Sequence, residues 1–180
     1  MSEQDWKISH TSITQVDRFK ITIDEVLLAN KETQNFSYIE FNEGVCVLAI
    51  TSDQKIVTIK QYRHPLQTTE IEFPAGMIDE KEEPITAAQR ELLEETGYHS
   101  ENWHSLDYFY PSPGSTTEKI YLFLAENAQK ISNQELDELE DIKIEVVDLK
   151  NFCKIVEKGD FRHGGAGLAC WARYLSMSNN

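Results

Sequence analysis

Three glutamates near the middle of the chain have a spacing that suits the binding of a divalent metal ion. Glu94 and Glu95 follow Glu91 by three and four positions, so a helix would carry all three carboxylates on one face. Carboxylates crowded in this way repel one another unless a cation lies among them, and Mg²⁺ and Mn²⁺ prefer such oxygen ligands. The alternative is an acidic helix face exposed to solvent. We expect a helix that binds Mg²⁺, with Mn²⁺ as a substitute.

The residues around these glutamates predict where the helix begins and ends. Pro84 suits the first helical turn, because proline lacks the amide hydrogen that would be unpaired there. Gly97 suits the position just after the last turn, where the backbone often becomes left-handed. Apolar side chains recur between Ala87 and Leu93 and would pack this helix on a core. The pattern therefore predicts a helix at about 84–96.

This region resembles the Nudix box, whose pattern is G-x5-E-x7-R-E-U-x-E-E-x-G-U, with U a bulky aliphatic residue. The residues that match at the required spacing are Gly76, Glu82, Arg90, Glu91, Leu92, Glu94, Glu95 and Gly97. Tyr98 departs from the pattern at the last aliphatic position, which is a packing position. The resemblance implies structural roles for Gly76, Glu82 and Gly97. Arg90 falls on another face of the helix from the metal ligands, and the resemblance implies that it has a structural role, orienting a box carboxylate such as Glu82.

Similarity to the ADP-ribose pyrophosphatase branch of this superfamily extends beyond the box. It is carried by QYRHPL at 61–66, IEFPAGMID at 71–79 and FYPSPGSTTEKIYLFLA at 109–125. Pro113 follows Gly97 at about the distance at which this branch has a proline. The resemblance implies hydrolysis of ADP-ribose to AMP and ribose 5-phosphate by a homodimer that exchanges its N-terminal extension.

Two alternatives to this activity remain open. GDP-mannose or another nucleotide sugar is the alternative substrate on the same scaffold. From a different class, the alternative is a sensor that binds ADP-ribose without cleaving it. The complete set of box glutamates argues against the sensor, because binding alone does not require a full metal-binding face.

The order of the predicted elements is typical of an α/β (α+β) protein. Apolar residues alternate with polar ones, or run continuously, in short segments that we interpret as strands. The expected strands are 16–26, 36–41, 44–50, 56–63, 70–73, 106–110, 119–125 and 143–147, and the expected helices are 84–96, 148–158 and 166–177. Together with the resemblance, this predicts an α/β/α sandwich with a mixed sheet at 44–180. A short β-rich, dimer-forming extension is expected at 1–43.

Helical geometry and the resemblance together assign the metal ligands. Glu91 and Glu95 lie one turn apart, so we expect both to coordinate a metal ion directly. Glu94 is expected to assist a second ion and so to take part in catalysis. The resemblance adds the backbone carbonyl of Ala75 as a further ligand.

An acidic segment before the last expected strand is the candidate source of the general base. Residues 135–141 read ELDELED. A base is needed to accept the proton of the attacking water, since the box carboxylates bind metal. The resemblance favours Glu138 for this role, with Glu140 as the second choice. The alternative is a run of solvated charges.

Substrate contacts are expected on both sides of the box. The resemblance places Arg63 against the substrate phosphates, where a guanidinium makes two parallel hydrogen bonds; the alternative is a surface ion pair. Glu72 suits a structural pairing and a ligand contact equally. The turn formed by Ser112, Pro113 and Gly114 is expected to lie along the terminal ribose. After that turn, Glu118 is expected to bind a ribose hydroxyl or to assist the metal ions.

Composition narrows the class of partner and the compartment. The chain has 17 basic and 31 acidic residues and a net charge of −14, which argues against binding to a nucleic acid backbone. The first ten residues lack signal-peptide character, and no apolar run is long enough to cross a bilayer. Three scattered cysteines indicate buried reduced thiols. We expect a cytoplasmic protein with no nucleic acid or membrane partner.

Overall fold

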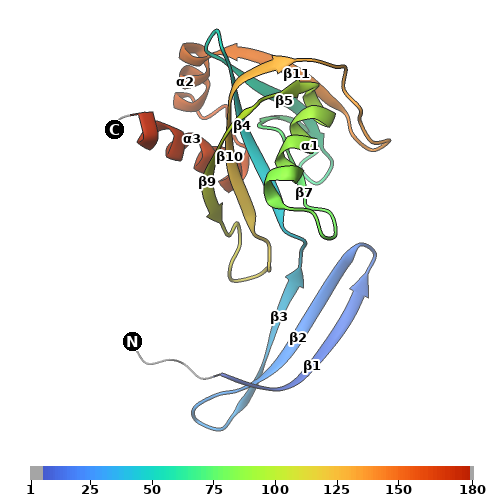
Figure 1. Cartoon of the computed structure of the whole chain (residues 1–180). Coiled ribbons are helices and arrows are strands. Elements are labelled where there is room, and N and C mark those ends of the chain that lie inside the picture. The colour runs from blue at the N-terminus through green and yellow to red at the C-terminus, as the bar shows by residue number, and fades with distance from the viewer. Residues whose placement is uncertain (1–5, 179–180) are drawn as a thin grey trace. The chain divides into compact units, whose positions relative to one another are not determined.

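The computed structural model describes residues 6–178, which fall into two compact units (Figure 1). The first unit contains Met1–Asn42 together with Ser112–Lys119, and the second contains Glu43–Pro111 and Ile120–Asn180. The loop at Ser112–Lys119, which lies inside the domain expected at 44–180, therefore groups with the N-terminal segment.

A three-stranded antiparallel sheet forms the first unit. Its strands are β1 (Lys7–Val16), β2 (Phe19–Leu27) and β3 (Thr33–Glu40), in the order β1-β2-β3. The sequence pattern predicts β2 and β3 but misses β1, because Lys7–Val16 mixes polar and apolar residues on both faces and all its residues are exposed. The loop at Ser112–Lys119 is held by β3, where the Ile39 amide donates to the Ser115 carbonyl at 2.9 Å.

The second unit is built on an eight-stranded mixed sheet. The strands are β4 (Gly44–Thr51), β5 (Lys55–Arg63), β6 (Thr68–Glu72), β7 (Ala75–Met77), β8 (Tyr98–His99), β9 (Asn102–Phe109), β10 (Ile120–Lys130) and β11 (Ile142–Asp148). The central path runs β11-β5-β4-β10-β8, with β6 on β5, β7 on β4 and β9 on β10. The β4–β10 pair is parallel and the other pairs are antiparallel. The expected mixed sheet is confirmed.

Helices cover both faces of this sheet, as Figure 1 shows. Alternate residues of β4 point to opposite faces. Val45, Val47 and Ala49 pack with α1 (Pro84–Thr96) in one buried cluster. The intervening residues of β4 pack with α2 (Leu149–Glu157) and α3 (Gly164–Ser178) in the other. The expected α/β/α sandwich and its helices are therefore confirmed. Within the described residues, no helix has the length and apolar character needed to cross a membrane.

Candidate functional site

Helix α1 presents its glutamates at the edge of the core. Pro84 occupies the first turn, and the helix ends at Gly97, whose amide donates to the Leu93 carbonyl. Glu91 and Glu95 lie on the buried side, with exposed fractions of 8% and 2%. Charged side chains are seldom buried to this extent without partners, so these two carboxylates mark a site rather than a solvated helix face.

A cavity of about 320 Å³ lies over these carboxylates. The residues that line it are Asp79, Arg90, Glu91, Glu94, Glu95, Glu135, Asp137 and Glu140. The acidic segment thus reaches the helix, where the Glu135 amide donates to the Glu94 carbonyl at 2.8 Å. The sequence analysis assigns no individual role to Asp79, Glu135 or Asp137. Asp79 ends a segment that carries the family resemblance, and the other two belong to the acidic segment.

Gly76 makes room for one of the buried carboxylates. A Cβ at this position would lie well under 3.0 Å from the Glu91 carboxylate, a distance that real Cβ atoms do not show. The preceding residue fixes the other carboxylate, because the Ala75 amide donates to Oε2 of Glu95 at 3.0 Å. The strand β7 therefore positions two of the three glutamates expected to bind metal.

Arg90 is the cation of this cluster. Its Nε and Nη2 donate to the two oxygens of Glu82 at 3.0 and 2.9 Å, which agrees with the expected orienting role. Its Nη1 also donates to Glu91 at 2.8 Å and to Glu94 at 3.0 Å. Arg90 thus contacts two of the glutamates expected to bind metal, although we expected it on a face of the helix away from the one they share. The guanidinium is long enough to reach carboxylates on that face as well.

Burial shapes the protonation of the cluster. It raises the pKa of Glu91, an effect opposed by the hydrogen bond from Arg90. It also holds the pKa of Glu95 well above its ordinary value; the Ala75 amide opposes the shift, and the charges of Glu91 and Glu140 add to it. A cation that compensates their charge would stabilise the ionised form of both carboxylates.

The donor set fits a hard divalent cation in its chemistry. It consists of carboxylate oxygens in a small polar cavity, the type of ligand that Mg²⁺ and Mn²⁺ favour. In their present positions, no three acidic, histidine or cysteine side chains among residues 6–178 converge closely enough to hold an ion. Because Arg90 draws Glu91 and Glu94 toward itself, metal binding would require these contacts to rearrange.

The two residues proposed for the base role differ in position. Glu140 lines the cavity and its charge acts on both Glu91 and Glu95. Glu138 is exposed and is not among the lining residues. The observed loop therefore favours the second choice made from the sequence over the first.

Arg63 is held in position by a buried carboxylate. Its Nε and Nη2 donate to the two oxygens of Glu72 at 2.8 and 2.5 Å. The Glu72 side chain is 4% exposed and that of Arg63 is 40% exposed. The hydrogen bonds to Glu72 raise the pKa of Arg63, and the charges of Glu95 and Glu140 add to this effect. Glu72 thus makes the structural pairing that was one of its two expected roles.

His163 also contacts Glu72 and has no predicted role. Its Nε2 lies 3.5 Å from Oε2 of Glu72, and its Nδ1 accepts the Phe73 amide at 3.0 Å. No signal in the sequence identifies it, because the contact joins segments 90 residues apart.

The residues expected along the ribose belong to the first unit. Ser112 begins a turn, in which its carbonyl accepts the amides of Ser115 and Thr116 at 3.0 and 2.9 Å. Pro113 and Gly114 lie within this turn, and Glu118 follows it. Burial raises the pKa of Glu118. The roles of these four residues stay predictions.

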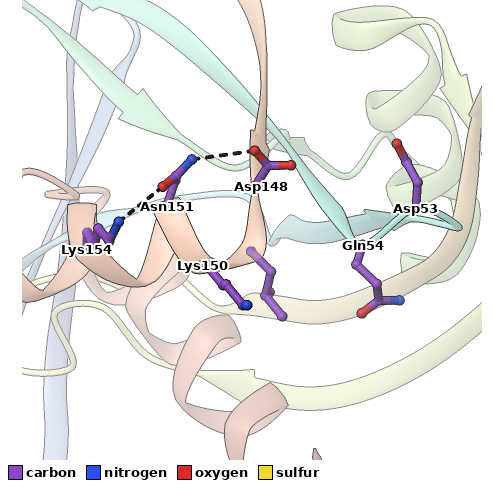
Figure 2. A pocket seen from close by; sticks show the side chains of 7 residues that line it. Asp53, Gln54, Asp148, Lys150, Asn151 and Lys154 are labelled. Atoms are coloured by element: carbon purple, nitrogen blue, oxygen red, sulfur yellow. Dashed lines mark hydrogen bonds between the residues drawn. The ribbon is translucent and has the colours of Figure 1, made fainter.

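A second, larger hollow lies elsewhere on the unit (Figure 2). It measures about 550 Å³, between the β4–β5 turn and the start of α2, and is lined by Asp53, Gln54, Asp148, Leu149, Lys150, Asn151 and Lys154. Asn151 and its neighbours Asp148 and Lys154 interact at 3.5 Å. Acidic and basic side chains are mixed here and no box residue is present, so the smaller cavity is the better candidate for chemistry.

The chain matches one family model and is similar in sequence to two named pyrophosphatases. The family model described as NUDIX domain matches residues 40–166. The chain is 38% identical over 136 residues to an ADP-ribose pyrophosphatase of Bacillus subtilis (strain 168), covering 75% of this chain and 74% of the relative. It is 31% identical over 145 residues to a GDP-mannose pyrophosphatase of Escherichia coli O1:K1 / APEC, covering 76% and 74%.

A solved structure described as an ADP compounds hydrolase has a similar fold. The TM-score is 0.87 at 21% sequence identity, and the match covers 99% of this chain and 97% of the other. At this identity the similarity supports the fold alone.

Proposed function

We infer that this chain, which belongs to the NUDIX domain family, hydrolyses the pyrophosphate bond of a nucleoside diphosphate sugar. We propose ADP-ribose as the substrate, with AMP and ribose 5-phosphate as products. The name of the Bacillus subtilis relative supports this choice, at 38% identity over 136 residues. The reaction adds one water across the anhydride and consumes no other reactant.

One observation carries the proposal. Glu91 and Glu95 are buried side by side on one face of α1 and line a polar cavity with the acidic segment. A protein that only packs a helix on a sheet has no need of two buried carboxylates there. Hydrolysis of a pyrophosphate requires a cation that neutralises the negative charge of the phosphates before water can attack. Buried carboxylates such as these would hold that cation.

The mechanism assigns a task to each part of the site. Enzymes of this family generally use divalent metal ions, and we propose Mg²⁺, with Mn²⁺ as a substitute. Glu91, Glu95 and the Ala75 carbonyl would hold the metal, with Glu94 assisting. The bound ion would supply charge neutralisation and an acidified water. Arg63 binds a substrate phosphate through the guanidinium edge that Glu72 leaves available.

Proton transfer is assigned to the acidic segment. We propose Glu140 as the base that accepts the proton of the attacking water, since it lines the cavity. Glu138 remains the alternative that the family resemblance favours, and a change in the loop would be needed to bring it in. Ser112, Pro113, Gly114 and Glu118 are proposed to contact the ribose.

GDP-mannose is the second candidate substrate. The Escherichia coli relative named for that activity covers 76% of this chain, nearly the same share as the Bacillus subtilis relative. Both substrates would use the same carboxylates and Arg63. The choice between them depends on contacts to the base and sugar.

We also propose a cytoplasmic homodimer that forms through the first unit. A three-stranded sheet buries little apolar surface by itself. Apolar side chains of this sheet remain exposed, including Ile8 at 59%, Ile13 at 57% and Val16 at 51%. A second copy of the chain would cover them. Sedimentation should therefore show a dimer for the wild type and a smaller fraction of dimer for Ile13→Glu. A monomeric wild type would contradict the proposal.

Product analysis tests the activity. The purified protein is incubated with Mg²⁺ and ADP-ribose, GDP-mannose, ADP-glucose or NADH, and the phosphate products are separated. AMP formed rapidly from ADP-ribose alone supports the proposed substrate. Preference for another compound would contradict ADP-ribose as the substrate but would still support hydrolysis of a pyrophosphate bond. Binding of ADP-ribose without turnover would instead favour a sensor.

A further inference from the structure

Two side chains from distant parts of the chain converge on one carboxylate oxygen. Oε2 of Glu72 accepts Nη2 of Arg63 at 2.5 Å, and Nε2 of His163 lies 3.5 Å from the same atom. Glu72 ends β6, Arg63 ends β5, and His163 directly precedes α3. The start of α3 is thus connected through Glu72 to the arginine proposed to bind phosphate.

One hydrogen bond of His163 defines its tautomer. The Phe73 amide donates to Nδ1 at 3.0 Å, so Nδ1 carries no proton. Burial lowers the pKa of His163, with a further contribution from Arg63 and an opposing one from Glu72, which favours the neutral ring. A neutral ring with an unprotonated Nδ1 carries its proton on Nε2, the atom that faces Glu72.

The ring has little freedom to move away from this position. Its side chain is 13% exposed, and its neighbour Phe161 packs on Phe73 with ring centroids 4.8 Å apart. The backbone of Phe73 is therefore fixed to the segment before α3 by a hydrogen bond and by an aromatic contact. Glu72 lies next to Phe73, so the same contacts limit where its carboxylate can go.

We propose that His163 is a positioning residue that acts through Glu72 to hold Arg63 in its phosphate-binding orientation. The inference rests on the proposed function, because Arg63 is assigned to the substrate there. Arg63 uses Nε and Nη2 for Glu72, which leaves Nη1 for a phosphate oxygen. A carboxylate oriented from one side only would allow the guanidinium to rotate and would weaken this contact.

A pair of substitutions separates positioning from folding. In His163→Asn the amide oxygen can still accept the Phe73 amide, but the side chain is too short to reach Glu72. In His163→Gln the longer amide can donate near the position of Nε2. We expect KM for the nucleotide sugar to rise about five- to tenfold in His163→Asn with kcat nearly unchanged. His163→Gln should restore most of the affinity.

Two further measurements connect the effect to Arg63. In the Arg63→Ala background, His163→Asn should add nothing to KM, because the two residues act through one contact. The Nε–H resonance of Arg63, assigned by its loss in Arg63→Lys, should shift or broaden in His163→Asn without any substrate present. His104→Asn is the matched control, since His104 pairs with exposed Glu126 at 2.9 Å, and it should change neither reading.

The outcomes are distinguishable. If the wild type turns over no nucleotide sugar, the proposed function fails, and the resonance of Arg63 still reports on the contact. If the wild type is active and Arg63→Ala raises KM, an unchanged KM in both His163 variants would overturn the positioning role. Additive effects of His163→Asn and Arg63→Ala would overturn it as well. Should His163→Asn unfold, His163→Ala takes its place: a raised KM and a shifted Arg63 resonance would support the role, and readings like those of His104→Asn would overturn it.

Discussion

The carboxylate of Glu91 lies in the space that a Cβ on Gly76 would occupy. The glycine belongs to β7 and the glutamate to α1, so the absence of a side chain on a strand decides where a helix residue places its charge. The spacing between these two residues in the sequence thus corresponds to direct contact in space.

Replacing Gly76 with alanine should remove most activity while the fold persists. The added methyl would push the Glu91 carboxylate away from Glu95 and disturb any shared ligand position. We expect kcat/KM to fall at least about tenfold, with a higher Mg²⁺ requirement. Kinetics over a Mg²⁺ titration, together with an unfolding transition, would test this. Wild-type activity in Gly76→Ala would contradict the tight approach.

Glu95→Gln should be nearly inactive and no less stable without metal. The amide oxygen of the glutamine can still accept the Ala75 amide. A neutral side chain also avoids the free-energy cost of burying a charge, the effect that raises the pKa of Glu95. We expect turnover to fall about a hundredfold or more, because a proposed metal ligand would be lost. Exposed Glu101→Gln is the control. Unchanged turnover at saturating Mg²⁺ would refute the assignment of Glu95 to the metal.

Glu140→Gln and Glu138→Gln should differ in their effect on turnover. Since Glu140 lines the cavity, we expect its replacement to lower kcat about a hundredfold with little change in KM. Glu138→Gln should have a much smaller effect. Single-turnover rates of both variants would decide the matter, and a larger loss in Glu138→Gln would return the base role to the residue that the family resemblance favours.

The stability of the protein should fall on acidification in part through His163. Burial lowers its pKa, so the unfolded chain binds a proton near pH 6.5 while the folded chain does not. The contribution is complete above that pH and is lost as the pH falls toward the folded pKa. Urea unfolding at pH 7.5 and 5.5 should show a smaller decrease in His163→Asn than in the wild type. Equal decreases would contradict the lowered pKa.

Arg90→Ala should destabilise the metal-free protein. The substitution removes hydrogen bonds to three carboxylates and to the Met77 carbonyl, and leaves partly buried charges unpaired. We expect a loss of about 3 kcal/mol in the free energy of unfolding. Added Mg²⁺ should reduce the deficit, since a cation would again compensate Glu91. Denaturant curves with Mg²⁺ and with EDTA would measure both effects.

Much of the core architecture could be predicted because local patterns specify it. Helix α1 was predictable from Pro84, Gly97 and its apolar face, and the observed Pro84–Thr96 has the predicted bounds. Strand β1 was missed because its alternation is weak, and β7 and β8 because segments of three and two residues carry too little pattern. The two short strands form only by pairing with longer neighbours, β7 with β4 and β8 with β10.

The site was harder to predict wherever contacts are long in sequence or side chains are long in reach. His163 contacts Phe73 across 90 positions, which no local pattern indicates. Arg90 extends around the helix to Glu91 and Glu94, so its backbone position does not define its partners. The choice between Glu138 and Glu140 depends on the conformation of a loop rather than on composition.

The contacts of Arg90 give the helix a resident counter-ion. The same guanidinium that anchors Glu82 also shares its charge with Glu91 and Glu94, so the acidic face is partly neutralised by the chain itself. A metal ion arriving at this face would compete with an internal cation rather than fill an unbalanced charge. Such competition would lower the affinity for the ion, and Arg90 would still compensate part of the charge of this face after the ion dissociates.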